Sequence, residues 1–146
     1  MKALHIRLHR RGAALLEFAL WILPLLIVLT GVIELSRMMS LKHQISRAAR
    51  DGARVGAGVL RNAAGTGVPT EPDIETTATN HALRVLTDLD LGCPAGCNVW
   101  SDWYDSPTGR KMLRVRVQYP YVPLVGLYPL ATSVERDFSM ATEYQP

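Results

Sequence analysis

The feature that most constrains the fold is an apolar stretch near the N-terminus. Residues 13–33 are 21 consecutive positions whose single ionisable side chain is Glu17. A helix rises about 1.5 Å per residue, so one of this length spans roughly the 30 Å hydrocarbon core of a bilayer. Pro24 lies inside the stretch, and membrane helices tolerate an internal proline better than soluble helices do. We therefore expect one transmembrane helix over residues 13–35.

Glu17 is the residue of this stretch that most needs an explanation. An acid at the centre of a membrane costs about 2.5–3.5 kcal/mol on insertion scales, and somewhat less near the edge. An intramembrane acid is therefore a functional hypothesis by default. The alternative is that Glu17 sits at the interface and extends its carboxylate toward the headgroups.

The charge of the chain is concentrated at its start. The formal net charge is +3, but the first twelve residues hold four basic residues and no acid, and the remaining 12 basic residues face 13 acidic ones. The excess is therefore no sign of a nucleic-acid partner. A basic tail before a span favours a cytoplasmic N-terminus, but Arg37, Lys42, Arg47 and Arg50 follow the span, so charge alone leaves the orientation open.

The helix is expected to continue past the membrane to about residue 61, because no proline interrupts residues 33–60. Gly52 and Gly56 form a G-x-x-x-G spacing, which brings helices together in membranes; here it lies past the span, so we favour the interpretation that these small residues let a sheet pack closely on the helix. Apolar and small residues recur at steps of three and four and predict the buried face: Leu41, Ile45, Ala48, Ala49, Gly52, Val55, Gly56 and Val59.

A linker over residues 62–72 separates this helix from a second one, because its glycines and prolines prevent regular structure. Thr70 followed by Asp73 resembles a capping box and predicts a helix over about Glu71–Leu89. His81 lies beside its apolar face and is expected to be half-buried. The predicted buried residues are Ile74, Ala78, Ala82, Val85, Leu86 and Leu89.

Three short strands follow, over about residues 98–104, 112–119 and 132–144, and the last two alternate apolar and polar residues as half-buried antiparallel strands do. Pro120 ends the second strand or marks it as an edge. Residues 120–131 are apolar and broken by prolines, which favours a packed loop, and a candidate partner-docking surface, over a second span. Asp137 or Glu135 is expected to face Arg114 or Arg116 across the sheet.

Two groups of residues in the second half have more than one interpretation. Trp100, Trp103 and Tyr104 fit packing in the core or at the sheet edge, and also fit a carbohydrate- or surface-binding patch. Cys93 and Cys97 fit a local disulfide in an oxidising compartment, two free thiols in a loop, or a metal or redox site. The last is disfavoured because C-x3-C is neither a usual zinc spacing nor the C-x-x-C redox motif.

Motifs of catalysis are absent from the sequence. It contains no H-E-x-x-H, G-x-S-x-G, P-loop or dinucleotide-binding glycine motif. The histidines are scattered at positions 5, 9, 43 and 81. We therefore predict no enzymatic activity, no cofactor, no metal and no small-molecule substrate.

A basic leader, Gly12, four mostly apolar residues, Glu17 and a long apolar helix resemble the precursors of type IV pilins and pseudopilins. The fuller string RRGAALLEFALWILPLLIVLTGVIELSRMM resembles the TadE-like minor pseudopilins of the tight-adherence (Flp) pilus system, and VRVQYPYVPL resembles their sheet region. The resemblance implies cleavage by a prepilin peptidase between Gly12 and Ala13. It also implies that Glu17 pairs with the new amino group of Ala13, and that Phe18 contributes to peptidase recognition.

The resemblance further implies a pilin-like α+β fold, in which a long N-terminal helix and a second helix pack on a small antiparallel sheet of about three strands. The expected divisions are a cleaved leader (1–12), a transmembrane helix (13–35), its periplasmic continuation (36–61) and a small α+β periplasmic domain (62–146). The expected location is the bacterial inner membrane with the N-terminus in the cytoplasm. The implied partners are the peptidase, other minor pilins, the major Flp pilin and the pilus assembly platform.

An uncleaved signal anchor is the alternative to this interpretation. It explains the basic tail and the apolar run, and it makes the chain a single-pass, membrane-anchored periplasmic binding protein. It gives no reason for an acid at the fifth position after Gly12.

Overall fold

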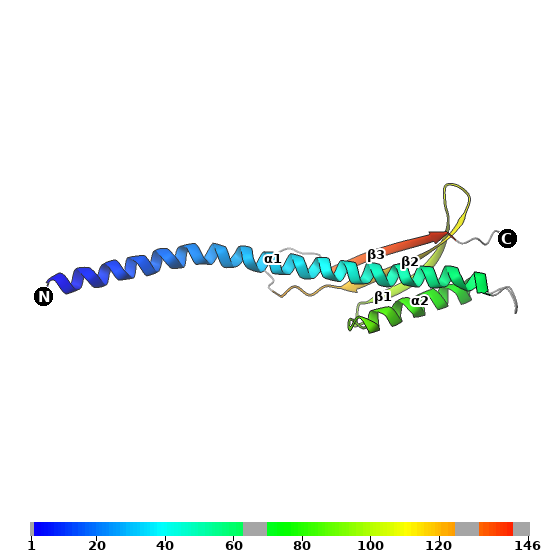
Figure 1. The fold of residues 1–146 in the computed structure, drawn as a ribbon, viewed down its shortest axis with the longest axis horizontal. Coiled ribbons are helices and arrows are strands. Elements are labelled where there is room, and N and C mark those ends of the chain that lie inside the picture. The colour runs from blue at the N-terminus through cyan, green and yellow to red at the C-terminus, as the bar shows by residue number, and fades with distance from the viewer. Residues whose placement is uncertain (1, 63–69, 125–131, 142–146) are drawn as a thin grey trace. The chain divides into compact units, whose positions relative to one another are not determined.

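The structure, a computed structural model, describes residues 2–62, 70–124 and 132–141. It divides into two compact units, which we treat separately: Met1–Arg37 with Leu124–Pro129, and Met38–Pro123 with Leu130–Pro146. The predicted α+β class is confirmed, with a long apolar N-terminal helix, a second helix and a three-stranded antiparallel sheet (Figure 1). The elements are α1 (Lys2–Asn62), α2 (Glu71–Asp88), β1 (Asn98–Asp105), β2 (Lys111–Pro120) and β3 (Ser133–Ala141).

Helix α1 is continuous over 61 residues and passes through Pro24. The predicted continuation beyond residue 35 is therefore confirmed. The helix also includes residues 2–12, which the sequence marked only as a basic tail. Within the first unit its apolar side chains face outward, as Leu15 (71% exposed), Trp21 (72%) and Leu23 (64%) illustrate.

Helix α2 begins where the capping signal predicted. The backbone N–H of Thr70 donates to Oδ2 of Asp73 at 3.1 Å, and the Thr70 hydroxyl donates to the same oxygen at 2.6 Å. The helix ends at Asp88, one residue before the predicted end. Its predicted face is confirmed, because Ile74, Ala78, Ala82 and Leu86 are buried, and His81 is half-buried as expected.

The sheet has the order β1-β2-β3 with antiparallel pairing throughout. Pro120 is the last residue of β2, where its missing N–H costs no ladder hydrogen bond in the middle of the strand. Of the two alternatives for Pro120, the prediction that it ends the strand is confirmed, and the edge alternative is excluded because β2 pairs with both neighbours and is the central strand.

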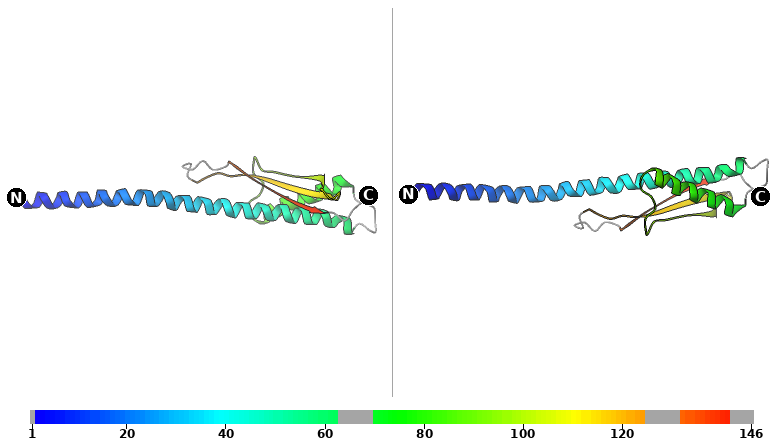
Figure 2. Two further views of the ribbon diagram at one scale, coloured as in Figure 1. Left: turned by 90° about the horizontal axis from the view of Figure 1, so that it is seen from above. Right: turned by 90° about the horizontal axis from the view of Figure 1, so that it is seen from below.

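Helices α1 and α2 cover one face of the sheet (Figures 1 and 2). The predicted alternation of β2 is confirmed, since Leu113, Val115 and Val117 are fully buried under the helices. Two clusters share this face. One contains Met38, Ile45, Ala48, Ala49, Leu86, Val117, Tyr121 and Val134, and the other contains Ala53, Ile74, Ala78, Ala82, Leu113 and Val115.

The two glycines of the G-x-x-x-G spacing lie where α1 meets α2 and β2. A Cβ atom at Gly52 would lie 2.8 Å from the carbonyl oxygen of Ala78 and 2.9 Å from the Cβ of Ala82. One at Gly56 would lie 2.6 Å from Cδ2 of Leu113 and 2.7 Å from the Cβ of Ala78. The expected close packing of the sheet is confirmed at Gly56, which meets Leu113 of β2, whereas the remaining close contacts of the two glycines are with α2.

Strand β3 covers Ser133–Ala141 of the predicted 132–144. Val134 is buried, Phe138 is half-buried, and Met140 is 37% exposed. Residues 142–144 of the predicted strand lie outside the described residues, as do residues 125–131 of the apolar loop.

Candidate functional site

The proposed cleavage point lies inside α1, because Gly12 and Ala13 both belong to the helix Lys2–Asn62. The backbone across this bond is therefore helical, and the leader continues into the apolar stretch without a break. Nothing in the structure tests the assignment of Gly12 and Ala13 to cleavage, so that assignment stays a prediction.

Glu17 lies on the helix one turn after Ala13. Four residues correspond to a rise of about 6 Å and place the two residues on the same face. The other positions at three- and four-residue spacing from Glu17 are Ala14, Leu20 and Trp21, so no basic side chain of α1 neighbours the carboxylate there. Within the uncut helix, the local neighbours of Glu17 along the chain are apolar.

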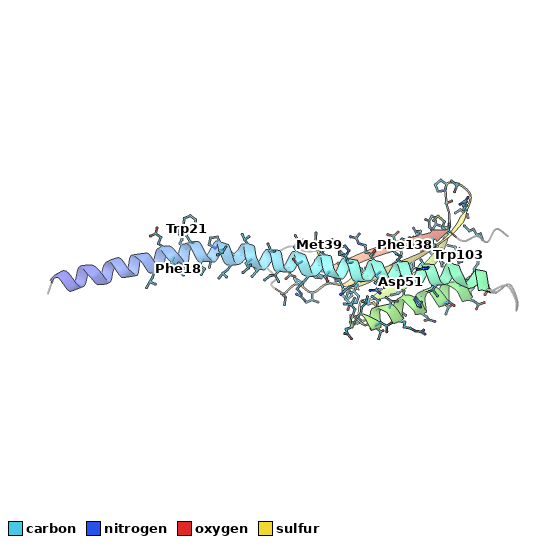
Figure 3. All side chains as sticks on the ribbon, viewed as in Figure 1. Phe18, Trp21, Met39, Asp51, Trp103 and Phe138 are labelled. Atoms are coloured by element: carbon cyan, nitrogen blue, oxygen red, sulfur yellow. A yellow bond between two sulfur atoms is a disulfide. The ribbon has the colours of Figure 1, made fainter. Side chains whose placement is uncertain are left out.

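The surroundings of Glu17 are an exposed apolar surface. Phe18 is 64% exposed, Leu16 is 71% exposed, and Phe18 and Trp21 project outward from α1 in Figure 3. In the described part of the chain one helix is long and apolar enough to cross a membrane, and the segment that meets this test begins at Leu15. The prediction of an apolar helix of membrane-spanning length is confirmed, and it gives the chain the character of a single-pass membrane protein.

A second acid, Glu34, was missed by the sequence analysis. Its side chain is 2% exposed, and both carboxylate oxygens accept the backbone N–H of Leu124 at 3.2 Å. Leu124 belongs to the same compact unit as the first 37 residues. The available signal was an acid that directly follows the apolar run, but nothing in the sequence points to a partner 90 positions later.

The two cysteines form a disulfide in the turn between α2 and β1. The N–H of Cys97 donates to the carbonyl oxygen of Pro94 at 2.9 Å, and Gly96 adopts a positive φ of 89°. A glycine tolerates this conformation without strain, so the P-A-G segment can form the tight turn that brings the thiols together. In the part of the chain that the structure describes, no group of His, Cys, Asp and Glu residues is arranged to hold a metal ion.

The aromatic residues of β1 are divided between the two faces of the sheet. Trp103 packs on the buried cluster around Ala53 and Leu113, as Figure 3 shows for its position near the helices. Trp100 and Tyr104 lie on the opposite face with Arg116 and Arg114, whose guanidinium carbons lie 6.0 Å and 5.0 Å from the ring centroids. Packing therefore explains Trp103, and cation–π contacts engage the other two rings.

The arginines of β2 pair with a different acid from the one predicted. Asp137 does lie opposite Arg116 in the register of β2 and β3. The ion pairs, however, join Arg114 and Arg116 to Asp102 of β1, with 3.7 Å between Arg116 Nε and Asp102 Oδ1. The expected facing of Asp137 and Arg116 is therefore confirmed, whereas the ion pairs go to Asp102, because the β1–β2 register places it directly opposite Arg114.

These contacts shift the pKa values of Asp102 and Arg114, which lie on the face of the sheet opposite the helices. Hydrogen bonds from Arg114 lower the pKa of Asp102, and the charges of Arg114 and Arg116 add to this effect. The same pairing raises the pKa of Arg114, so the guanidinium stays charged. On α2, burial and the charges of Glu71 and Asp102 raise the pKa of Glu75. The shifts of Asp102 and Arg114 are those of a structural ion pair, since each favours the charged form of its group.

Comparison with known proteins gives one match. A family model described as TadE-like protein matches residues 12–54, which is the stretch from the predicted cleavage point to two residues after Gly52. No curated protein and no solved structure matches the chain. The resemblance to TadE-like proteins that the sequence suggested is thus confirmed over residues 12–54, which lie within α1.

Proposed function

We propose that this chain is a minor pilin or pseudopilin that takes part in assembling a tight-adherence Flp pilus, by initiating, capping or anchoring it. The observation that supports this most strongly is the position of Glu17, one helical turn after Ala13 on an exposed apolar helix, inside the segment that matches the TadE-like family. A plain membrane anchor needs the apolar surface but has no use for the acid.

In this proposal, cleavage between Gly12 and Ala13 creates the partner that Glu17 lacks. The cut removes four basic residues and leaves an α-amino group at Ala13, which lies at four-residue spacing from Glu17. It also turns the middle of a continuous helix into a helix N-terminus, whose free N–H groups and positive dipole end favour a nearby carboxylate. Both effects reduce the cost of an acid in hydrocarbon.

The same pair can form between two subunits. When apolar helices pack side by side, the amino group of one chain can bind Glu17 of its neighbour, and the requirement that no charge stay unpaired in hydrocarbon fixes their axial register. The partners in this proposal are the prepilin peptidase, other minor pilins, the major Flp pilin and the assembly platform. The helix sits in the inner membrane, the N-terminus is cytoplasmic, and the α+β part lies in the periplasm.

The N-terminus of the mature protein, purified from native membranes and measured by intact mass, is the first test. We expect a chain that starts at Ala13, twelve residues shorter than the translated sequence. The Gly12→Arg variant is expected to insert in the membrane but keep its leader, because a large charged side chain would occupy the space that the peptidase needs at the cut. His9→Arg, which adds the same side chain three residues earlier, is the control and should mature normally.

A start at Met1 would instead support the alternative, an uncleaved single-pass protein that binds an envelope partner. Normal maturation of Gly12→Arg would remove Gly12 from the cleavage mechanism.

Glu17 is tested separately by piliation. We expect Glu17→Leu to stay membrane-inserted, because it makes the helix more apolar, and to lose the assembly role, giving piliation close to that of a deletion. Thr30→Leu is the matched control, because the Thr30 hydroxyl already donates to the carbonyl oxygen of Ile27 within the helix at 2.9 Å. Normal piliation in Glu17→Leu, with none in the deletion, would exclude Glu17 from assembly.

A further inference from the structure

Two exposed apolar side chains follow the central strand of the sheet. Val122 is 77% exposed and Leu124 is 63% exposed. Single exposed apolar residues are normal on protein surfaces and need no explanation. Leu124 differs because its backbone N–H is bound by a side chain of α1.

That side chain lies at the C-terminal end of the apolar stretch. Glu34 directly follows residues 13–33, and its two oxygens accept the N–H of Leu124. Hydrogen bonds to an ionised carboxylate are among the stronger ones in proteins. If residues 13–33 fill the hydrocarbon, Glu34 and the backbone of Leu124 lie at its boundary with the headgroups.

The helix surface on both sides of Glu34 is apolar and exposed as well. Val32 is 57% exposed, Ile33 is 47% exposed and Leu35 is 51% exposed. These residues and Leu124 belong to the same compact unit. Leu124 therefore adds a further apolar side chain to the level at which the helix leaves the membrane.

The backbone at Leu124 is also suited to a medium of low polarity, in which each unsatisfied N–H is costly. Pro123 has no N–H, and the N–H of Leu124 is bound by Glu34. The sequence from Pro120 to Ala131 contains no charged residue that would have to be desolvated.

We propose that Leu124 is a second membrane contact of this protein: its side chain inserts into the boundary of the phospholipid layer at the end of the span, and Glu34 is the positioning residue that holds it there. The partner is lipid rather than another protein, because the segment is fixed to the span at the depth where lipid begins. The proposal rests on α1 crossing a membrane. It requires neither cleavage at Gly12 nor a pilus.

The test measures depth, since the span alone makes the whole chain membrane-bound. Nitroxide labels are placed on Leu124→Cys, on Leu26→Cys in the span and on Asn80→Cys, an exposed site of α2, in the full-length chain in phosphatidylcholine–phosphatidylglycerol vesicles. Labelling is done without reductant, which leaves the Cys93–Cys97 disulfide intact. Power saturation then compares access of oxygen, which concentrates in lipid, with access of a water-soluble nickel chelate.

We expect the labels at 124 and 26 to favour oxygen and the label at 80 to favour nickel. A label at 124 that matches the one at 80, or that neither reagent reaches, would overturn the lipid contact while leaving the span and the proposed function standing. An aqueous label at 26 would overturn the span and the lipid contact together.

The role of Glu34 is tested in the same system. Glu34→Ala removes both acceptor oxygens and should shift the label at 124 toward nickel access, whereas Glu34→Gln keeps one acceptor oxygen and should change it little. An unchanged spectrum of the label at 80 verifies that the fold survives each substitution. A label at 124 that stays in lipid in Glu34→Ala would show that Glu34 does not position the segment.

Discussion

Two acids mark the two ends of the same apolar stretch and have different surroundings. Glu17 lies among exposed apolar side chains, whereas Glu34 is buried and binds a backbone N–H. An acid with a local hydrogen-bond donor has a structural role without any partner subunit. Glu17 gains a cationic neighbour along its own helix only if the chain is cut. At the scale of single residues, this difference is why we assign assembly to Glu17 and positioning to Glu34.

Asp102 gives a prediction at the same scale. Its pKa is lowered in the folded protein, chiefly by the hydrogen bonds from Arg114, so its contribution to stability is present above the unfolded pKa of about 3.9 and is lost as the pH falls through the lower folded value. Because the pair is partly exposed, we expect Asp102→Asn to lower the free energy of unfolding at pH 7 by only about 0.5–1 kcal/mol.

Denaturant unfolding at pH 7 and at pH 3 measures this effect. The difference between wild type and Asp102→Asn should shrink at the lower pH, while Asp105→Asn on the same strand should differ little from wild type at either pH. A difference for Asp102→Asn that is equal at both pH values would contradict the ion-pair explanation.

At the scale of elements, the association of α1 with α2 depends on the absence of side chains. Gly52 faces the backbone of α2, so the two helices approach more closely than any larger residue permits. The alanines at 78 and 82 keep the facing surface equally shallow. Small residues on both helices thus let the larger side chains of β2 reach the common core.

Replacing two glycines of α1 by alanine is predicted to change the stability of the fold in opposite directions. A Cβ at Gly52 would meet a backbone oxygen that cannot move aside, so Gly52→Ala should destabilise the fold by about 1–3 kcal/mol, as overpacking does. Gly58→Ala meets no atom within 4 Å and should stabilise α1 by up to about 1 kcal/mol through helix propensity alone. Thermal unfolding followed by circular dichroism measures both. Equal effects of the two substitutions would contradict the close-approach argument.

At the scale of the whole molecule, burial is confined to one unit. Among the described residues, every buried hydrophobic side chain lies between Met38 and Val134, in the unit that holds α2 and the sheet. The start of α1 contributes no buried apolar residue to that core, and its exposed surface is satisfied by lipid in our proposal. The two units therefore obtain their stability from different surroundings.

We accordingly expect a fragment of residues 36–146 to be water-soluble, to keep the helix and strand content of the second unit, and to unfold cooperatively. The full chain should need detergent or lipid. Circular dichroism and analytical ultracentrifugation of the fragment measure this. A fragment that aggregates or melts without a cooperative transition would show that the N-terminal part of α1 is needed for the fold.

The elements of this protein could be predicted because their signals are local. The period of three and four residues along α1 and α2, the Thr70–Asp73 cap and the alternation of β2 each depend on neighbours within one turn or one strand, and each was confirmed. The TadE-like resemblance is local too, because it lies in residues around Gly12 and Glu17 and in the following helix.

What the sequence could not decide were contacts between distant segments. It offered Asp137 as an acid facing an arginine of β2, as the register confirms, but it did not identify Asp102 as the acid of the ion pairs, because the partner of Arg114 follows from the β1–β2 register and not from the alternation of either strand. It gave Trp103 and Trp100 the same interpretations. Successive residues of a strand point to opposite faces of the sheet, so these two, three positions apart, lie on different faces, and of the two it is Trp103 that faces the helices. The sequence by itself determined a helix long and apolar enough to span a membrane, from the uninterrupted apolar run of residues 13–33. It also determined the continuation of that helix, the second helix and the alternating strands, since these follow from the period of apolar residues. Only the tertiary structure brought Leu124 to Glu34, because a hydrogen bond across 90 residues depends on the path of the whole chain between them.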